Sequence, residues 1–254
     1  MKRKTLAIPL RLTDYSDSTQ IVSLFTRDVG LLEGIAKGAY REKNAFQGAF
    51  DIAVLREVVF VERRTQGLAI VTESSVLDGY RGLRGSWKRH VAASHVVELL
   101  RAVTTQGDAS PALFDLSHAV LRRLSDASEE AISDCLLHFE LRALRLLGFL
   151  SPIDACAACS RPWPGEGRPA YFSPRSGGLL CRRCVRARPL PGGATTLPGP
   201  QVKILQRLAE NTLMRENGRL ERALSRRLHR LLFEGCIFFL ECPFKMVKYS
   251  PAWL

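Results

Sequence analysis

Two C-x-x-C pairs constrain this chain more than any other feature of its sequence. Cys156 and Cys159 form the first pair, Cys181 and Cys184 form the second, and 21 residues lie between the pairs. Each pair presents two thiolates to one tetrahedral metal ion, and four soft thiolates complete the coordination shell that zinc prefers. A closed shell leaves no position for water. The spacing therefore predicts a structural Zn²⁺ site rather than a catalytic one.

Other uses of four cysteines remain open on the spacing alone. Disulfides form in oxidising compartments, four thiolates also hold iron–sulfur clusters, and a site of this kind can lose its metal. Between the pairs, residues 169–172 and 178–180 have the composition of short strands, and residues 173–178 have that of a turn. This pattern predicts a zinc-ribbon-like module over residues 156–189, with the second cysteine pair at the end of a hairpin.

The charge balance indicates a polyanionic partner. The 254-residue chain contains 37 Lys and Arg against 25 Asp and Glu, a net charge of +12, which favours nucleic acid or an anionic membrane surface. The sequence has no run of about 18 apolar residues, so membrane insertion is not expected. We expect a cytoplasmic, nucleoid-associated protein, in which Cys135 and Cys236 lie among apolar residues and pack in the core. Cys242 is a third cysteine outside the pairs.

The first 80 residues have the pattern of a small β-barrel. Short runs rich in β-branched and apolar residues alternate with Gly, Asp, Asn and Arg clusters, at residues 6–12, 19–26, 31–37, 51–61 and 68–72. In the second run, apolar residues occur at both odd and even positions, which point to opposite faces of a strand. That strand is therefore predicted to be covered on both faces. Gly30 supplies a positive φ for a turn, and Pro9 requires an edge or a bulge in the first strand.

A basic loop follows the third of these runs. Lys37, Arg41 and Lys43 surround one aromatic side chain, Tyr40, next to a glycine. A loop of this kind on a small barrel is a plausible platform for phosphates and stacked bases, and Arg11 is a further candidate contact. The alternative is a solvated turn without a partner, and the loop alone does not decide between the two.

The rest of the chain is predominantly helical. Apolar periodicity and capping residues predict helices over residues 87–104, from Ser110 with Pro111 at the first helical position, and from Ser128 to Gly148. Two more are predicted over residues 201–214 and 218–233, after a Pro- and Gly-rich stretch at residues 190–200 that has the composition of a linker. The fold class is thus α+β. We expect a small β-barrel at 1–80, a helical domain at 81–155 and 190–254, and the cysteine module inserted between its parts.

The predicted helix at residues 218–233 has leucines on one face and arginines on the other. Arg222 and Arg226 lie on the arginine face, and their helical spacing clusters their charge. They are candidate DNA contacts, although arginines that merely solvate a surface helix would show the same pattern.

One enzyme pattern needs to be considered. His138 and Glu140 in an H-x-E triplet, followed by the first cysteine pair, imitate the zinc nucleobase deaminases. Ala155 stands where that pattern has proline, and Cys181 and Cys184 would have no role. The triplet also lies within a periodic helix that packing explains. The motifs of P-loop nucleotidases, serine hydrolases and zincin proteases are absent from the sequence. We expect a binding protein rather than an enzyme.

The whole chain resembles the RecO family of bacterial recombination mediators. The resemblance is carried by the order and spacing of DYSDS (14–18), IVSLFTR (21–27) with Gly30, IAKGA (35–39) with Arg41 and Lys43, FELRALRLLGF (139–149) and YFSPRSGGLLC (171–181). It extends from about residue 6 to the C-terminal helices. Gln20 departs from the pattern, because a basic residue is usual there.

The resemblance implies an N-terminal oligonucleotide-binding (OB) barrel, a helical domain and an inserted zinc module. It implies no enzymatic activity. Proteins of this family bind single- and double-stranded DNA, anneal complementary strands and contact the single-stranded-DNA-binding protein. Together with RecR they help to load the RecA recombinase. Lys37, Arg41 and Lys43 match basic positions of the family's barrel loop. A functional class that the residues leave open is a zinc-ribbon scaffold of the transcription machinery, whose positive charge meets acidic protein surfaces.

Overall fold

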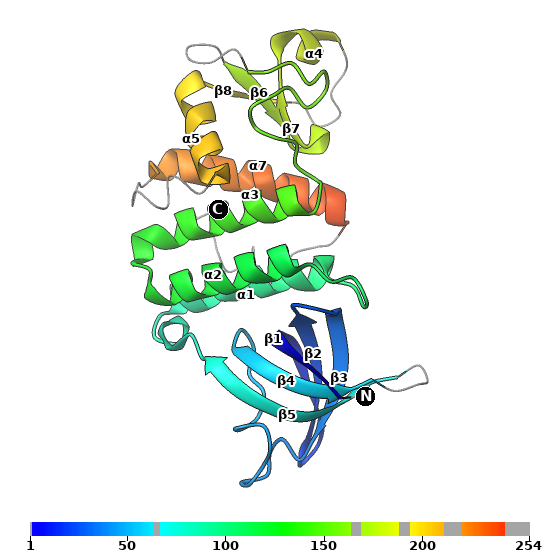
Figure 1. Cartoon of the computed structure of the whole chain (residues 1–254). Coiled ribbons are helices and arrows are strands. Elements are labelled where there is room, and N and C mark those ends of the chain that lie inside the picture. The colour runs from blue at the N-terminus through cyan, green and yellow to red at the C-terminus, as the bar shows by residue number, and fades with distance from the viewer. Residues whose placement is uncertain (1, 63–66, 164–168, 188–193, 211–219, 242–254) are drawn as a thin grey trace. The chain divides into compact units, whose positions relative to one another are not determined.

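The chain forms two compact units, Met1–Asp126 and Ala127–Leu254, and each is described by itself. The computed structural model describes residues 2–62, 67–163, 169–187, 194–210 and 220–241 (Figure 1). Cys242 and part of the predicted helices at 201–214 and 218–233 lie outside these ranges. Within the described residues, the apolar stretches of the helices are too short or too interrupted by charge to cross a bilayer.

Five strands of the first unit close into a barrel. They are β1 (Lys2–Ser16), β2 (Thr19–Thr26), β3 (Gly30–Lys37), β4 (Leu55–Val61) and β5 (Ala69–Asp78). The hydrogen-bonded order is β1-β2-β3-β5-β4, with β4 returning to β1 (Figure 1). All pairs are antiparallel except β3 with β5. This order and the single parallel pair are typical of the OB-fold, which confirms the predicted barrel.

Strand β1 is longer than its apolar pattern predicts. Its first half pairs with β4 and its second half with β2, so ladder hydrogen bonds extend it into polar residues at both ends. The register shifts between Pro9 and Arg11, as expected of a bulge at a residue without an N–H. The Pro9 carbonyl accepts a hydrogen bond from the Ala53 N–H at 3.2 Å. Residues 51–54, predicted as part of a strand, therefore belong to a loop, and Ala53 has a φ of 54°.

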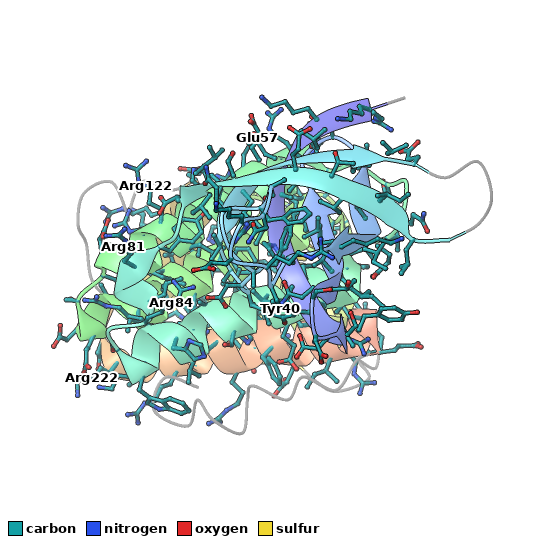
Figure 2. The ribbon with its side chains drawn as sticks, turned by 90° about the horizontal axis from the view of Figure 1, so that it is seen from below. Tyr40, Glu57, Arg81, Arg84, Arg122 and Arg222 are labelled. Atoms are coloured by element: carbon teal, nitrogen blue, oxygen red, sulfur yellow. The ribbon has the colours of Figure 1, made fainter. Side chains whose placement is uncertain are left out.

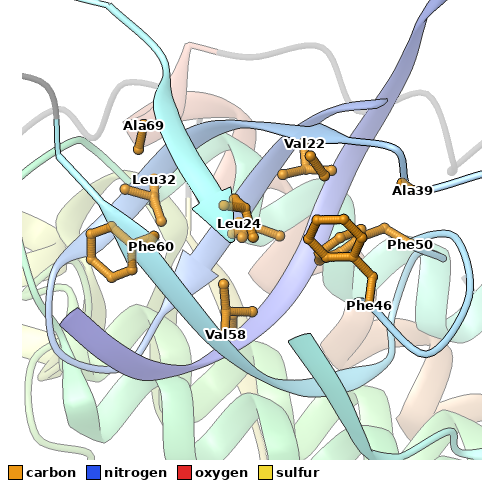
Figure 3. Packing of buried hydrophobic residues seen from close by; sticks show 12 residues of the cluster. Val22, Leu24, Leu32, Ala39, Phe46, Phe50, Val58, Phe60 and Ala69 are labelled. Carbon is orange, nitrogen blue, oxygen red and sulfur yellow. The ribbon is translucent and has the colours of Figure 1, made fainter. Parts of the chain in front are cut away.

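The barrel core is filled by side chains from every strand and from the loop between β3 and β4. Phe60 on β4 and Leu24 on β2 are fully buried within it (Figure 3). Phe46 and Phe50 come from the loop and pack with ring centroids 5.8 Å apart. Each large apolar side chain buried in this way contributes about 1.5–3 kcal/mol. The loop is therefore part of the core, and its position is set by the barrel.

Two long helices complete the first unit. The short 3₁₀ helix η1 (Arg81–Leu83) leads into α1 (Trp87–Val103), and α2 (Pro111–Asp126) follows. Phe114 of α2 packs on Phe25 of β2 with centroids 5.4 Å apart, so β2 is covered on both faces as predicted. Gly30 has a φ of 73°, and a Cβ there would lie 2.4 Å from the Asp108 carbonyl oxygen. Only glycine fits this turn.

Outside the cysteine module, the described helices of the second unit are η2 (Glu129–Ala131), α3 (Ile132–Leu146), α5 (Gly199–Ala209) and α7 (Arg222–Leu240). The predicted stop of α3 at Gly148 is confirmed by its φ of 77°. Its α-helical part begins later than Ser128, after one 3₁₀ turn. Helix α7 continues past residue 233, because Phe239 stacks on Phe149 at a centroid distance of 5.1 Å and holds the last turn.

The cysteine module contains a three-stranded sheet. Its strands are β6 (Ala170–Ser173), β7 (Gly178–Leu180) and β8 (Thr195–Leu197), in the order β7-β6-β8. The predicted hairpin is confirmed, with the 3₁₀ turn η3 (Pro174–Ser176) between β6 and β7. The prediction of a linker at 190–200 is wrong for β8, which pairs antiparallel with β6. A three-residue strand gains its stability from that pairing, which local composition does not reveal.

Candidate metal centre and nucleic-acid interface

The four paired cysteines meet at one point. Cys156 and Cys159 precede β6, whereas Cys181 and Cys184 lie directly after β7 and on the short helix α4 (Arg182–Ala187). Their four Sγ atoms lie within 4.8 Å of one another, and the Sγ atoms of Cys159 and Cys181 are 3.9 Å apart. The cluster is therefore formed by two turns that the hairpin brings together.

Backbone hydrogen bonds join these two turns. The Ala157 N–H donates to the Leu179 carbonyl at 2.7 Å, and the Cys181 N–H donates to the Cys156 Sγ at 3.3 Å. At the opposite end of the hairpin, Gly177 has a φ of 63°, and a Cβ there would lie 2.4 Å from the Phe149 carbonyl oxygen. The backbone thus holds both cysteine pairs in position.

The environment of the cluster favours a thiolate at one cysteine. Burial of Cys156 opposes its ionisation, but hydrogen bonds from the backbone N–H groups of Cys181, Ala158 and Cys159 outweigh burial and lower its pKa to about 6. The pKa of Cys184 is raised to about 12, because its hydrogen bond to the Cys181 side chain and its burial both favour the neutral thiol. A divalent cation would reverse the second effect, since thiols that coordinate a metal are deprotonated.

The geometry fits a four-coordinate metal ion. Sulfur atoms about 2.3 Å from a tetrahedral Zn²⁺ are separated by about 3.8 Å, close to the 3.9 Å between the Cys159 and Cys181 sulfurs. Only these four cysteines form such a group among the described residues. The cluster is thus able to bind a metal ion. Cys135 and Cys236 are buried apart from it, as predicted.

His138 and Glu140, the residues of the deaminase-like triplet, have other partners. The His138 Nδ1 lies 2.9 Å from the Leu208 carbonyl oxygen at the end of α5. The Glu140 Oε2 lies 2.9 Å from the Nδ1 of His229 on α7, and both of these side chains are buried. The triplet therefore joins α3 to its neighbouring helices and contributes nothing to the cysteine cluster.

The basic loop of the barrel is exposed where it was predicted to be. Lys37 ends β3, and Arg41 and Lys43 lie on the tight turn that follows, all three side chains exposed. The Arg41 N–H donates to the Gly38 carbonyl at 3.1 Å, and Gly38 has a φ of 82°. The three charges are thus carried by one turn of the backbone.

Tyr40 lies on the same turn and is 42% exposed (Figure 2). Its hydroxyl donates to the carboxylate of Asp14, and this hydrogen bond is the main cause of its raised pKa. The ring is thereby held in a fixed position with part of its surface free. Arg11 is exposed elsewhere on the barrel, on β1 opposite Ser23.

Two buried polar side chains anchor the loop between β3 and β4. The Gln20 amide accepts from the Phe50 N–H at 2.8 Å and faces the Phe50 carbonyl with its nitrogen at 3.4 Å. Gln20 is thus a structural residue that anchors the loop, a role that fits its place at a position where a basic residue is usual. Arg56, 3% exposed, donates to the carbonyls of Phe46 and Ala49, each at 2.8 Å, and lies over the Phe50 ring. Desolvation lowers its pKa.

Arg56 was not predicted to be important for this site. One feature of the sequence could have indicated its role. Arg56 is a charged residue that occupies a position on the buried face of β4, two residues before the apolar Val58. That signal predicts a buried cation with acceptors nearby, but it does not say that those acceptors are carbonyls of the loop.

The candidate contacts of the second unit are exposed at the start of α7. Arg222 and Arg226 point away from the buried stripe that contains Leu224 and Leu228. Their neighbour Arg227 donates to the Thr196 carbonyl of β8. The structure thus places Arg222 and Arg226 on one helix face, in the other compact unit from Lys37, Arg41 and Lys43.

A second cationic feature of the first unit was not predicted. Arg81 and Arg122 line a cleft of about 520 Å³ between the end of β5 and α2, and both lie apart from Tyr40 in Figure 2. The cleft also contains Asp78 and Asp126, which offset this positive charge. Its mixed lining makes it a weaker candidate for phosphates than the basic turn at residues 37–43.

Comparisons with known proteins agree with this architecture. Models of the N-terminal and C-terminal parts of recombination protein O match residues 1–80 and 84–240. The chain is 32% identical over 179 residues to the DNA repair protein RecO of Rhodopirellula baltica, covering 70% of this chain and 66% of that protein. It is 35% identical over 195 residues to that of Anaeromyxobacter dehalogenans, covering 77% and 73%.

A third relative, the DNA repair protein RecO of Dehalococcoides mccartyi, is 29% identical over 210 residues, covering 82% of this chain and 79% of that protein. Both halves of the chain thus match in the order in which the barrel and the helices occur. This match decides against a scaffold of the transcription machinery. The chain belongs to the RecO family of DNA repair and recombination proteins.

Proposed function

We propose that this chain is a non-enzymatic, DNA-binding recombination mediator that anneals complementary single strands and helps to load a recombinase onto single-stranded DNA. The single observation that carries the proposal is the exposed basic turn of Lys37, Arg41 and Lys43 on an anchored loop of an OB barrel. Its partners would be single- and double-stranded DNA, the single-stranded-DNA-binding protein and RecR, with RecA acting downstream. The work of such a protein is cytoplasmic, at the nucleoid, and needs no membrane.

The physical basis is charge neutralisation combined with stacking. Two complementary strands repel each other through their phosphates, and cations that bind both strands lower this repulsion. The partly exposed Tyr40 ring offers a face on which a base can stack. With about six phosphates engaged, log affinity should fall against log salt with a slope of about −5 for duplex and about −4 for single strands.

The proposal assigns a role to each part of the chain. Residues 1–80 bind DNA, the helical segments at 81–155 and 190–254 are divided between the two compact units, and the second unit contains the zinc module of residues 156–189, to which β8 adds a strand. Arg11, Arg222 and Arg226 are secondary DNA contacts. The cysteine cluster holds Zn²⁺ as a structural ion, and the four thiolates serve to fold the module.

The test is charge reversal of Lys37, Arg41 and Lys43 to Glu in one variant. Affinity for single-stranded DNA should fall at least about tenfold, and the salt slope should decrease by about 2, because each phosphate contact contributes about 0.7. Reversal of Arg81, Arg101 and Arg122 to Glu is the matched control, since these side chains are exposed on the same unit outside the basic turn. Circular dichroism verifies folding of both variants.

The annealing step is measured with complementary strands coated by single-stranded-DNA-binding protein. The wild-type chain should accelerate annealing, and the variant of the basic turn should lose this acceleration while the control retains it. Equal affinity and equal annealing rates in all three proteins would show that the turn is a solvated loop that does not contact DNA. A salt-independent affinity of the wild-type chain would contradict the electrostatic mechanism itself.

A further inference from the structure

The cysteine module contains a cleft that the proposed function does not use. It has a volume of about 450 Å³, within the range of small-molecule sites. Its walls come from the segment after the first cysteine pair, from β6 and from the start of α4. The residues that matter for its chemistry are Arg161, Trp163, Pro169, Tyr171, Arg182 and Arg183.

The lining of the cleft is cationic. Among the residues that the structure describes, three guanidinium groups and no carboxylate line the cleft, and none of the three has an ion-pair partner within this part of the chain. The module sequence 156–189 contains seven arginines and one glutamate, and thus contributes +6 of the net charge of +12. A divalent ion with four thiolates carries a charge of about −2. The three arginines of the cleft exceed this charge, so the cleft still attracts an anion.

The apolar part of the lining is aromatic and flat. Tyr171 is half-buried on β6, the central strand of the three, where it is paired with both Leu180 and Thr196. Trp163 is also half-buried, and its backbone N–H donates to the Asp154 carbonyl at 2.6 Å. Both rings are therefore attached to backbone that is hydrogen-bonded in place. Flat rings next to guanidinium groups are the combination on which unpaired bases stack.

We propose that this cleft binds one nucleotide of single-stranded DNA, with its base against Trp163 and Tyr171 and its phosphate near Arg182 and Arg183. The assignment rests on the proposed function, and it adds a base-contacting site in the other compact unit from the barrel. Bases of a duplex are stacked and paired and do not enter a concave cleft, so the site selects single strands. An acidic peptide with an apolar end matches the charge, but rings and prolines favour a planar group over a branched aliphatic one.

The metal centre supports one wall of this cleft. Cys181 belongs to the lining, and Arg182 and Arg183 lie between the two cysteines of the second pair. Their backbone is thus set by the same turn that holds Cys181 and Cys184. Metal content must therefore be measured in every variant, so that loss of nucleotide binding is separated from loss of the fold.

Trp163 provides a direct readout in the full-length chain. In a Trp87→Phe, Trp253→Phe background, a short oligothymidylate should quench the Trp163 fluorescence. Trp163→Ala removes this signal, so its affinity is measured by the fluorescence anisotropy of a labelled oligothymidylate, and it should be about tenfold weaker, the effect of one lost base–aromatic stack. Arg182→Ala with Arg183→Ala should lower the salt slope by about 1. Arg186→Ala is the matched control: this arginine is exposed on the same short helix, outside the cleft lining, and its loss should leave the affinity unchanged.

Each result decides between the two proposals. If wild-type chain binds the oligonucleotide but Trp163→Ala, with full metal content, binds equally well, the cleft assignment is overturned and DNA binding by the barrel stands. If the wild-type chain binds no single-stranded DNA, both proposals fail. If an acidic peptide with a C-terminal branched aliphatic residue quenches Trp163 and oligothymidylate does not, the cleft is a peptide site and the nucleotide assignment is wrong.

Discussion

The two compact units are almost equal in length, but different interactions hold them together. The first, Met1–Asp126, is built on a closed barrel whose strands pair all the way round and enclose apolar side chains from β1 to β5. The second, Ala127–Leu254, combines helices with a module whose strands are three or four residues long and whose two cysteine pairs converge. It also buries a Glu140–His229 pair between α3 and α7.

The difference shows how the surface that we propose to contact DNA is kept in shape. The barrel is large enough to fix its basic loop through apolar burial and backbone hydrogen bonds, with Phe46 and Phe50 inserted into the core. The cysteine module is too small to bury a comparable core, and small modules of this kind depend on metal ligation. The second unit should therefore respond to chelators and to pH, whereas the first should respond to changes in its packing.

The largest expected effect separates the units by metal dependence. Cys181→Ser, or chelation of the wild-type chain, should remove an apparent binding energy of about 10 kcal/mol or more from the folding of the module. Hydrogen exchange resolved by peptide should show lost protection across residues 154–187, with the barrel at residues 2–62 unchanged. Metal analysis should find one zinc per wild-type chain.

Cys236→Ala is the control for this experiment. Cys236 is buried on α7 outside the cluster, so its loss should leave the metal content unchanged. Wild-type protection of the module in metal-free Cys181→Ser protein would contradict the structural role of the cluster and the contrast between the two units.

The next largest effect concerns the first unit. Arg56→Met removes the donors to the Phe46 and Ala49 carbonyls and leaves these buried acceptors without partners. The expected loss in free energy of unfolding is roughly 2–4 kcal/mol. Hydrogen exchange of residues 38–54 should rise, and affinity for single-stranded DNA should fall even though Arg56 is buried.

Lys2→Met is the matched control, because this exposed cation has only a surface ion pair with Glu73, which contributes little. If the loop keeps its protection in Arg56→Met, the apolar core alone positions it. Metal content should be the same in both variants, which keeps the effect within the first unit.

The smallest effect is the pH dependence of the second unit. His229 Nε2 faces the Ser133 carbonyl and Nδ1 faces the Glu140 carboxylate, so both ring nitrogens meet acceptors and donate together only when the imidazole is protonated. Burial lowers the pKa of His229, but the charge and hydrogen bond of Glu140 outweigh it and raise the pKa above the usual value of about 6.5.

A pKa raised in the folded state contributes stability that is fully present below the unfolded-state pKa of about 6.5 and is lost as the pH rises through the folded value. Denaturation of the second unit should therefore become easier from pH 6 toward alkaline pH, relative to Glu140→Gln. Comparison with this variant cancels the pH dependence of metal binding, which both proteins share. A constant difference across that range would show that His229 is neutral in the folded chain.

Local sequence signals predicted the structure correctly at positions where the residue type itself restricts the backbone conformation. Pro9 lies at a bulge, Gly30 has a positive φ, α3 ends just before Gly148, and Pro111 begins a helix, all as predicted. They failed where a segment takes its structure from a distant partner. Strand β8 forms because β6 is beside it, and α7 extends past residue 233 because Phe149 meets Phe239.

The sequence by itself determined the fold class and the four cysteines that can bind a metal ion, because a barrel-forming strand pattern, helical periodicity and two C-x-x-C pairs are each local. It also determined which basic residues lie on the loop after β3. Only the tertiary structure decided that Arg56 and Gln20 anchor this loop, that Glu140 and His229 pair, and that Trp163 and Tyr171 share a cationic cleft. These residues are far apart in sequence, and their roles follow from burial and from the partners that folding brings to them.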